Sequence, residues 1–299
     1  MPAQESPFSL RSLDHLVLPV SSLGAARERL TKLGFCVAAD AVHPFGTENA
    51  CVFLADGIYL EPLGIASRET CEAAAIKGNV FVARDQAYRF RNGQDGFSAL
   101  VLSSRDAAAD HARYRREGMS GGEMLEFSRP FLQADGTSAE ASFRLAFAAD
   151  LRSPDFFLFA CERTRERPPL PEALLKHANG ASGLSRVVLS EENPTDFQYL
   201  FETAFGQRDV TAHSFGMDLK AANVTVSVLT PDGLQAWYGL KPKPGRGLVA
   251  QALVFAVPSL ATVEAQLVAH NIKFETRHQR ILVGPAPGQG AVFAFEERA

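Results

Sequence analysis

The sequence is organised by a pattern that recurs four times. Each copy has an apolar strand-like run, a helix cap, an amphipathic helix and then further strand-like runs. The first copy starts with LDHLVLPV at residues 13–20, and the second follows at an offset of 84, where the run 100–102 falls on 16–18. The third and fourth copies begin near residues 183 and 250. Such self-similarity predicts four related structural units.

Each copy predicts one strand, one helix and three further strands. Ser22, Asp106, Asn193 and Ser259 precede the four helical segments, where a short polar side chain can accept a first-turn N–H. A helix is also expected over 68–75, between the first two copies. The strands expected after the helices are 35–43, 50–55, 58–64, 122–129, 141–149, 155–161, 208–217, 222–229, 234–239 and short pieces that end with AVFAFEE.

The four copies divide into two pairs. Residues 164–182 are first charged, then proline-rich, then glycine-terminated, which is typical of a linker. We therefore expect one domain over 8–163, which holds copies one and two, and a second over 183–299, which holds copies three and four. The fold class is α+β, built from four βαβββ modules.

Composition excludes several classes of function. With 299 residues, of which 46% are hydrophobic, the chain is long enough for two domains with substantial cores. A net charge of -4 and dispersed Lys and Arg give no nucleic-acid footprint. The N-terminus lacks a signal-peptide pattern, and no apolar run reaches the roughly 18 residues of a membrane span, so we expect a cytoplasmic protein without membrane contact. The four cysteines form no CxxC pair and are expected to be reduced core thiols.

Three ionisable residues in the first copy mark a candidate site. His15 and Glu61 each lie inside an apolar strand-like run, and a buried ionisable group needs a partner or a purpose. His43 precedes a proline and a glycine turn, where a rigid backbone can aim its side chain inward. The alternative for His43 is a surface residue that stabilises the turn.

These residues carry a resemblance to a known family. The strings LDHLVL, H-P-x-G-T-x-N at 43–49 and YLEPLG resemble glyoxalase-like domain proteins of the vicinal oxygen chelate superfamily, which includes glyoxalase I, bleomycin-resistance proteins and extradiol dioxygenases. The resemblance implies paired modules whose curled mixed sheets enclose a cup. It also implies that His15 and Glu61, with His43 as a third ligand, hold a divalent ion such as Mn, Fe, Ni or Zn, and that His15 and Glu61 are the catalytic pair.

The second module departs from the family pattern. Ala99 occupies the position equivalent to His15, and the position equivalent to Glu61 falls at about Phe159, so the partner ligands are missing. The second domain has Arg186, Ala252 and Ala294 at the corresponding places and is expected to lack a metal. For His15 and Glu61, a hydrogen-bonded pair without metal therefore remains open beside the metal site.

Several residues are candidates for substrate contact, and His43 is one of them as well as a candidate ligand. Phe131 and Phe159 belong to strands expected to line the cup, although aromatic stripes also serve as plain core. Arg129 and Arg144 lie in strand-like surroundings, where an arginine can clamp an anionic substrate or simply remain solvated.

Two function classes follow from these observations. The first is a glyoxalase-like lyase, isomerase or dioxygenase that acts on a dicarbonyl, phenolic or related small molecule. The second is a ligand-binding or sequestration protein that kept the cup but lost the full metal site. The resemblance also leaves a homodimer open, since such proteins often pair.

Overall fold

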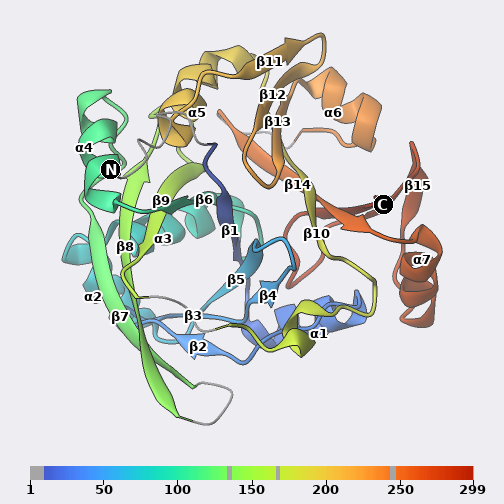
Figure 1. The fold of residues 1–299 in the computed structure, drawn as a ribbon, viewed down its shortest axis with the longest axis horizontal. Helices are drawn as coiled ribbons and strands as arrows, with labels where there is room; N and C mark the ends of the chain where they lie inside the picture. Colours follow the sequence, from blue (N-terminus) through green and yellow to red (C-terminus); the bar gives the residue numbers. More distant parts are fainter. Residues whose placement is uncertain (1–9, 133–136, 166–168, 243–246, 299) are drawn as a thin grey trace, which may run out of the picture.

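The computed structural model describes residues 10–132, 137–165, 169–242 and 247–298, which form two sheet-and-helix halves lying side by side (Figure 1). The N-terminal half contains β1 (Leu13–Pro19), α1 (Leu23–Lys32), β2 (Ala41–Val42), β3 (Thr47–Asn49), β4 (Val52–Phe53), β5 (Tyr59–Ile65), α2 (Arg68–Ile76), α3 (Val80–Asn92), β6 (Ala99–Ser104), α4 (Ala107–Arg116), β7 (Leu125–Leu132), β8 (Ser138–Ala148) and β9 (Phe157–Arg163). A short 3-10 turn, η1 (Glu172–Leu175), follows.

The C-terminal half has a similar order of elements, with three strands instead of four after its first α-helix and one helix instead of two before its second module. It contains β10 (Gly183–Ser190), η2 (Pro194–Phe197), α5 (Gln198–Phe205), β11 (Val210–His213), β12 (Gly216–Lys220), β13 (Thr225–Leu229), α6 (Pro231–Tyr238), β14 (Val249–Val257), α7 (Leu260–Ala269), β15 (Glu275–Arg277), β16 (Arg280–Val283) and β17 (Val292–Glu297). The expected α+β fold of four βαβββ modules in two pairs is confirmed.

Each half has one mixed sheet with the two module-leading strands at its centre. The described residues give a nine-stranded sheet in the order β2-β3-β5-β1-β6-β9-β8-β7, with β4 also on β5, and an eight-stranded sheet in the order β11-β12-β13-β10-β14-β17-β16-β15. In the first sheet, β1 runs parallel to β5 and antiparallel to β6. Because leading strands meet antiparallel, the two modules of each half are related by an approximate twofold.

Some expected strands differ from the structure. The segment expected as one strand over 208–217 spans two antiparallel strands, β11 and β12, joined by a turn at 214–215. The segment expected as a strand over 234–239 belongs instead to α6, because the Thr230 hydroxyl caps the Gly233 N–H at 3.1 Å and Pro231 suits the first helical turn. The strand expected over 35–43 is reduced to the two residues of β2. The segments 35–43 and 234–239 suit a strand by their apolar and aromatic composition, but the local chain geometry gives a two-residue strand in the first and a helix in the second.

Alternation along the strands separates two apolar layers in the first half. Leu16, Leu18 and Leu60 face the helices and belong to the large core, whereas Val17 and Leu63 face the concave side. The concave layer also contains aromatic side chains from β9 and α3, which packs over the cup. This layer forms the walls of the site described below.

The large core continues from one half into the other. The same cluster of buried residues includes Leu30 and Leu100 from the first half and Phe255 and Phe293 from the second. Phe35 lies at the junction, with its ring centroid 4.9 Å from that of Phe255. The two halves therefore pack against each other through one continuous hydrophobic core.

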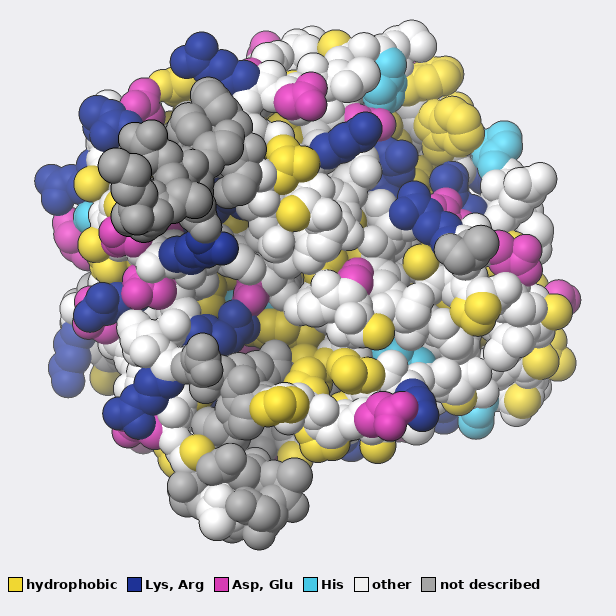
Figure 2. Space-filling view, in the orientation of Figure 1, with side chains coloured by type: hydrophobic (Ala, Val, Ile, Leu, Met, Phe, Trp, Pro, Cys, Tyr) yellow, Lys and Arg dark blue, Asp and Glu magenta, His cyan; other side chains and the backbone are white. Residues whose placement is uncertain are grey.

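Charges of both signs are mixed on one face of the molecule. On the face drawn in Figure 2, Lys and Arg side chains are interspersed with Asp and Glu. None of the helices in the described ranges combines the length and the apolar character needed to cross a membrane.

Candidate functional site

His15 lies in β1 on the concave face and is almost completely buried. Its Nδ1 is 2.6 Å from Asp14 Oδ2, and its Nε2 is 3.4 Å from Glu61 Oε2. The ring stacks on Tyr59 with centroids 4.5 Å apart. Asp14 can reach the ring of its neighbour because the register of β1 against β6 shifts between Leu13 and His15. The imidazole is thus held between two carboxylates.

The position of Asp14 is fixed by an arginine from β9, the last strand of the first half. Arg163, at the end of β9, places Nη2 2.9 Å from Asp14 Oδ2 and 3.3 Å from the Tyr59 hydroxyl. Asp14 is 6% exposed, so its charge needs this partner. The arrangement orients His15 through a carboxylate that is itself held by an arginine.

Glu61 connects His15 to His43. Asn49 Nδ2 donates to Glu61 Oε1 at 2.7 Å, and His43 Nε2 lies 3.8 Å from the same oxygen. The other nitrogen of His43 is 2.9 Å from the Thr47 hydroxyl. The turn after His43 leads directly into β3, which carries Asn49, so both side chains reach the same carboxylate.

The electrostatics set the charges of these groups. Burial opposes ionisation of Glu61, but hydrogen bonding to His15, the charges of the two histidines and the Asn49 hydrogen bond outweigh it and lower its pKa to about 2. Burial disfavours the imidazolium of His15, yet its bonds to Asp14 and Glu61 raise its pKa. His43 is buried without a comparable partner, and its pKa falls to about 4. At neutral pH, Glu61 is ionised and His43 is neutral.

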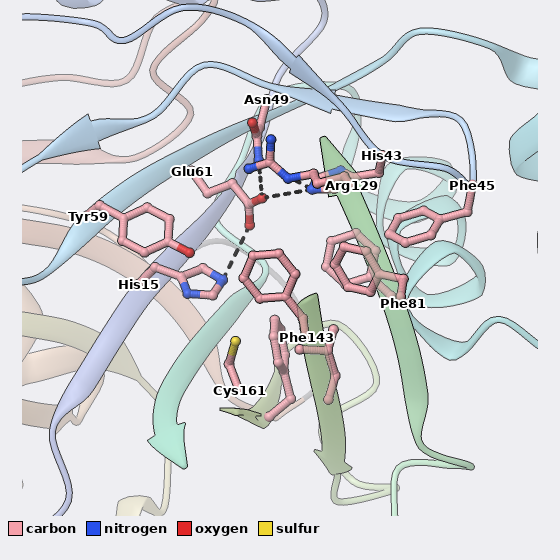
Figure 3. Close-up of a pocket in the computed structure, with 13 residues that line it drawn as sticks. His15, His43, Phe45, Asn49, Tyr59, Glu61, Phe81, Arg129, Phe143 and Cys161 are labelled. Atoms are coloured by element: carbon pink, nitrogen blue, oxygen red, sulfur yellow. Dashed lines mark hydrogen bonds and ion pairs between the residues drawn. The ribbon is translucent and has the colours of Figure 1, made fainter. Parts of the chain in front are cut away.

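A small cavity of about 40 Å³ lies against this cluster. Figure 3 shows His15, Glu61 and Asn49 toward one end and aromatic rings along the other walls. Phe127 from the sheet edge β7 reaches the opposite edge, 5.7 Å from His43 and 5.1 Å from Phe45 between ring centroids. The sheet therefore curls until its edges nearly meet. The lining consists of His15, His43, Phe45, Asn49, Tyr59, Glu61, Phe81, Phe127, Arg129, Phe143, Leu145, Phe159 and Cys161.

Not every expected site residue lies at the cavity. His15, His43, Glu61, Arg129 and Phe159 line it, as their positions in the sequence suggested. Arg144 does not: its guanidinium is 3.2 Å from Glu126 and 3.9 Å from Glu162, on the other face of β8. Phe131 is part of β7, but its side chain lies outside the described residues.

Sequence reasoning missed several side chains of the site. Asn49 stood in the 43–49 motif but was not assigned a role, and Asp14 was taken as a neighbour of His15 only. Arg163 and Phe81 lie far from the motif in the sequence, with no local signal. Their approach depends on how β9 and α3 fold back over the cup.

Strand register tests the equivalences between modules. His15 pairs with Tyr59 in the first module as Ala99 pairs with Phe157 in the second, so Ala99 and Phe159 occupy the positions of His15 and Glu61. In the C-terminal half, Arg186 takes the position of His15 and forms an ion pair with Asp218 at 2.9 Å. The His–Glu pair thus occurs in one module of four.

The donor set is chemically suited to a divalent ion, but its side chains are not assembled as a metal cluster. Two imidazoles and one carboxylate are ligands for Mn, Fe or Zn, and Asp14 and Thr47 would support them from behind. Ligands about 2.1 Å from one ion lie roughly 3.0–3.4 Å apart, so the His15–Glu61 spacing fits and the 3.8 Å spacing to His43 is wide. Within the described ranges, no group of three or more such side chains is arranged to hold a metal.

Comparison with known proteins agrees with the fold. Residues 13–205 match the glyoxalase-like domain family. The chain therefore belongs to this family, within the vicinal oxygen chelate superfamily. A search of curated proteins found no match.

Solved structures are similar over nearly the whole chain. A hypothetical protein from Staphylococcus aureus has a TM-score of 0.65 at 12% identity, covering 96% of this chain and 100% of that one. A mutant form of 4-hydroxymandelate synthase from Streptomyces coelicolor has a TM-score of 0.60 at 15% identity, covering 97% of this chain and 93% of that one. A Mn(II)-bound glyoxalase from Novosphingobium aromaticivorans has a TM-score of 0.53 at 14% identity, covering 97% of this chain and 83% of that one. At these identities the likeness concerns the fold.

Proposed function

We propose that this protein is a glyoxalase-like enzyme that moves a proton beside a carbonyl group of a small molecule. The observation that carries the proposal is the buried contact of His15 with Glu61 at the wall of a cavity, with His43 beside them. Buried, strongly perturbed titratable groups that converge on a cavity are characteristic of catalytic sites.

Glu61 is the base in this mechanism, and its strength depends on His15. In the free protein, the hydrogen bond with His15 keeps the pKa of Glu61 at about 2, which makes it a weak base. A substrate oxygen that accepts the His15 Nε2 proton removes this bond, and burial then raises the basicity of the carboxylate. Asp14 keeps His15 oriented while its proton is shared.

In a metal-loaded form of the site, a divalent ion would be held by His15, His43 and Glu61, and Nε2 of His15 would then be a ligand without a proton to donate. When bound, the ion supplies a Lewis acid that polarises a carbonyl oxygen. The donor chemistry and the Mn(II)-bound glyoxalase of similar fold support this part of the proposal. A readout independent of activity is the melting temperature: we expect Mn²⁺, Fe²⁺, Ni²⁺ or Zn²⁺ to raise it in the wild type, and Glu61→Gln to abolish the rise.

Deuterium exchange tests the proton transfer without knowledge of the product. Dicarbonyl, phenolic and 2-oxo compounds are incubated in D₂O with the full chain, with and without each metal, and exchange at carbon beside the carbonyl is followed by NMR. We expect catalysed exchange that falls by about 10²–10⁴-fold in Glu61→Gln. Glu48→Gln, a carboxylate outside the cavity lining, should retain the wild-type rate.

A binding protein without catalysis is the second candidate. The vacant positions at Ala99 and Phe159 favour it, because the second module contributes no ligand to the cup. Saturable ligand binding with no exchange above the uncatalysed rate in any metal condition would support this candidate and reject the enzyme.

A further inference from the structure

The charges around the cavity leave one arginine unmatched. Asp14 pairs with Arg163, and His15 pairs with Glu61. Arg129 also lines the cavity, but in the described part of the chain it forms no ion pair, and its Nε is buried without a hydrogen-bond partner. A buried donor that is not satisfied costs roughly 1–3 kcal/mol, and more when it is charged. The free cavity thus contains one guanidinium without a carboxylate partner among the described residues.

Strand alternation explains why Arg129 faces the cavity and Arg144 does not. On β7, Phe127 and Arg129 are two residues apart and both line the cavity. On β8, Phe143 and Leu145 line it, so Arg144 between them points to the other face and pairs with Glu126. Two arginines of the same hairpin therefore have opposite environments.

Arg129 lies near the reactive end of the cavity. It lines the same cavity as His43, and its charge contributes to the lowered pKa of His43 (Figure 3). A guanidinium binds a carboxylate through two parallel N–H donors, which also fixes the orientation of the bound group. A carboxylate at Arg129 would place its next carbon toward Glu61 and His15.

The size of the cavity limits the ligand. Its volume of about 40 Å³ is on the order of three waters. The remaining walls are rings of phenylalanine, which pack against one another and leave little additional room; they are Phe45, Phe81, Phe127, Phe143 and Phe159.

We propose that the cavity binds a small carboxylate, of acetate to pyruvate size, through Arg129. The inference rests on the proposed function only for turnover, since binding depends on Arg129 and the cavity. The carboxylate neutralises the unmatched guanidinium, and a neighbouring carbonyl oxygen of the ligand accepts the proton of His15. Specificity for anions over neutral molecules of equal shape follows from the unpaired guanidinium of Arg129.

Calorimetric titration of the full chain with matched ligands tests the proposal. Acetate and pyruvate are compared with the neutral acetamide and pyruvamide and with the larger benzoate. We expect pyruvate to bind at least tenfold more tightly than pyruvamide, and benzoate to bind more weakly than acetate. Equal affinity for the neutral amides and the carboxylates would contradict recognition of the negative charge by Arg129. Tight binding of benzoate would contradict the limit that the cavity volume places on ligand size.

The two arginines of the hairpin provide matched variants. We expect Arg129→Gln to weaken pyruvate binding at least tenfold and to remove the preference over pyruvamide, while Arg144→Gln binds as the wild type does. Unchanged binding in Arg129→Gln contradicts the proposal. Circular dichroism checks the fold of each variant, and the comparison of charged with neutral ligands on the wild type remains decisive if Arg129→Gln does not fold.

A third variant separates this inference from the proposed function. Glu61→Gln removes a negative charge near the ligand, so pyruvate binding should persist or tighten while proton exchange is lost. Carboxylate binding without exchange in the wild type would reject the enzyme and retain the anion site. Proton exchange on neutral dicarbonyls without carboxylate binding would retain the enzyme and reject the anion site.

Discussion

At the scale of single residues, the site depends on charges that stabilise one another out of contact with water. Asp14 Oδ2 contacts both Nδ1 of His15 and Nη2 of Arg163. No other carboxylate lies as close to either of these two nitrogens among the described residues. The sequence marked His15 and Glu61 because a charge in an apolar strand is unusual. It did not mark Asp14, because adjacent residues of a regular strand point to opposite faces, and only the register shift in β1 brings the two together.

Removal of the Asp14 charge should destabilise the whole protein. Asp14→Asn leaves Arg163 without its carboxylate and weakens the bond to His15, so we expect a loss of about 3 kcal/mol in the free energy of unfolding, measured with urea. Glu126→Gln is the control, since its exposed pair with Arg144 is worth at most about 1 kcal/mol. Equal small losses in the two variants would show that Asp14 is not essential to the packing.

His43 should make stability depend on pH. Its folded pKa of about 4 lies below the ordinary value of 6.5, so only the unfolded chain takes up this proton between those values. Its contribution to stability is therefore complete above pH 6.5 and is lost as pH falls toward 4, by up to about 3 kcal/mol. His43→Gln should reduce the difference in unfolding free energy between pH 7 and pH 4.5. An unchanged difference would assign the acid sensitivity to other groups.

At the scale of elements, α3 is joined to the sheet by one buried arginine. Arg89 donates to the carbonyl oxygens of Val20 at 2.9 Å and Leu63 at 2.7 Å, and it is paired with Asp85 at 2.7 Å. These bonds hold α3 against the ends of β1 and β5 and thereby place Phe81 in the wall of the cavity. Arg89 lies between the first two copies of the sequence repeat, outside the motif residues, so the sequence did not indicate its role.

Loss of this attachment should loosen α3 before the sheet. Arg89→Met leaves two carbonyl groups and Asp85 without their buried donor, and we expect the amide protons of α3 to exchange at least tenfold faster while those of β1 and β5 change little. Arg91→Met, on the same helix, removes an exposed pair with Asp155 and an exposed hydrogen bond to the Pro154 carbonyl, and it serves as the control. Equal exchange in both variants would contradict the role of Arg89.

At the scale of the whole molecule, the two halves are joined by more than the linker. Arg11 donates to Asp110 in the first half and to the carbonyl of Ala204 in the second, both at 3.0 Å. Gly290 approaches so closely that a Cβ there would lie 2.4 Å from the Gly96 nitrogen. The family match, which runs from 13 to 205, likewise passes from the first half into the second.

A truncated first half should therefore fail to fold stably. Removal of residues 169–299 exposes the part of the core that packs against Phe255 and Phe293, an apolar surface that a folded monomer rarely tolerates. We expect the fragment 1–168 to bind a hydrophobic dye and to lack a cooperative thermal transition. A fragment with a sharp transition and native-like near-UV circular dichroism would show that the shared core is dispensable.

The sequence by itself determined the repeated module, the strand faces and the candidates His15, Glu61 and His43, because periodicity and residue type are local properties. Tertiary structure decided which of two hairpin arginines reaches the cavity, how Arg163 and Asp14 orient His15, and that Phe127 closes the cup against the turn at His43. Those contacts join residues far apart in the chain, and they depend on sheet curvature and strand register. α6 differs in kind, because its cap Thr230 and Pro231 are local signals in the sequence that outweighed a strand-like composition.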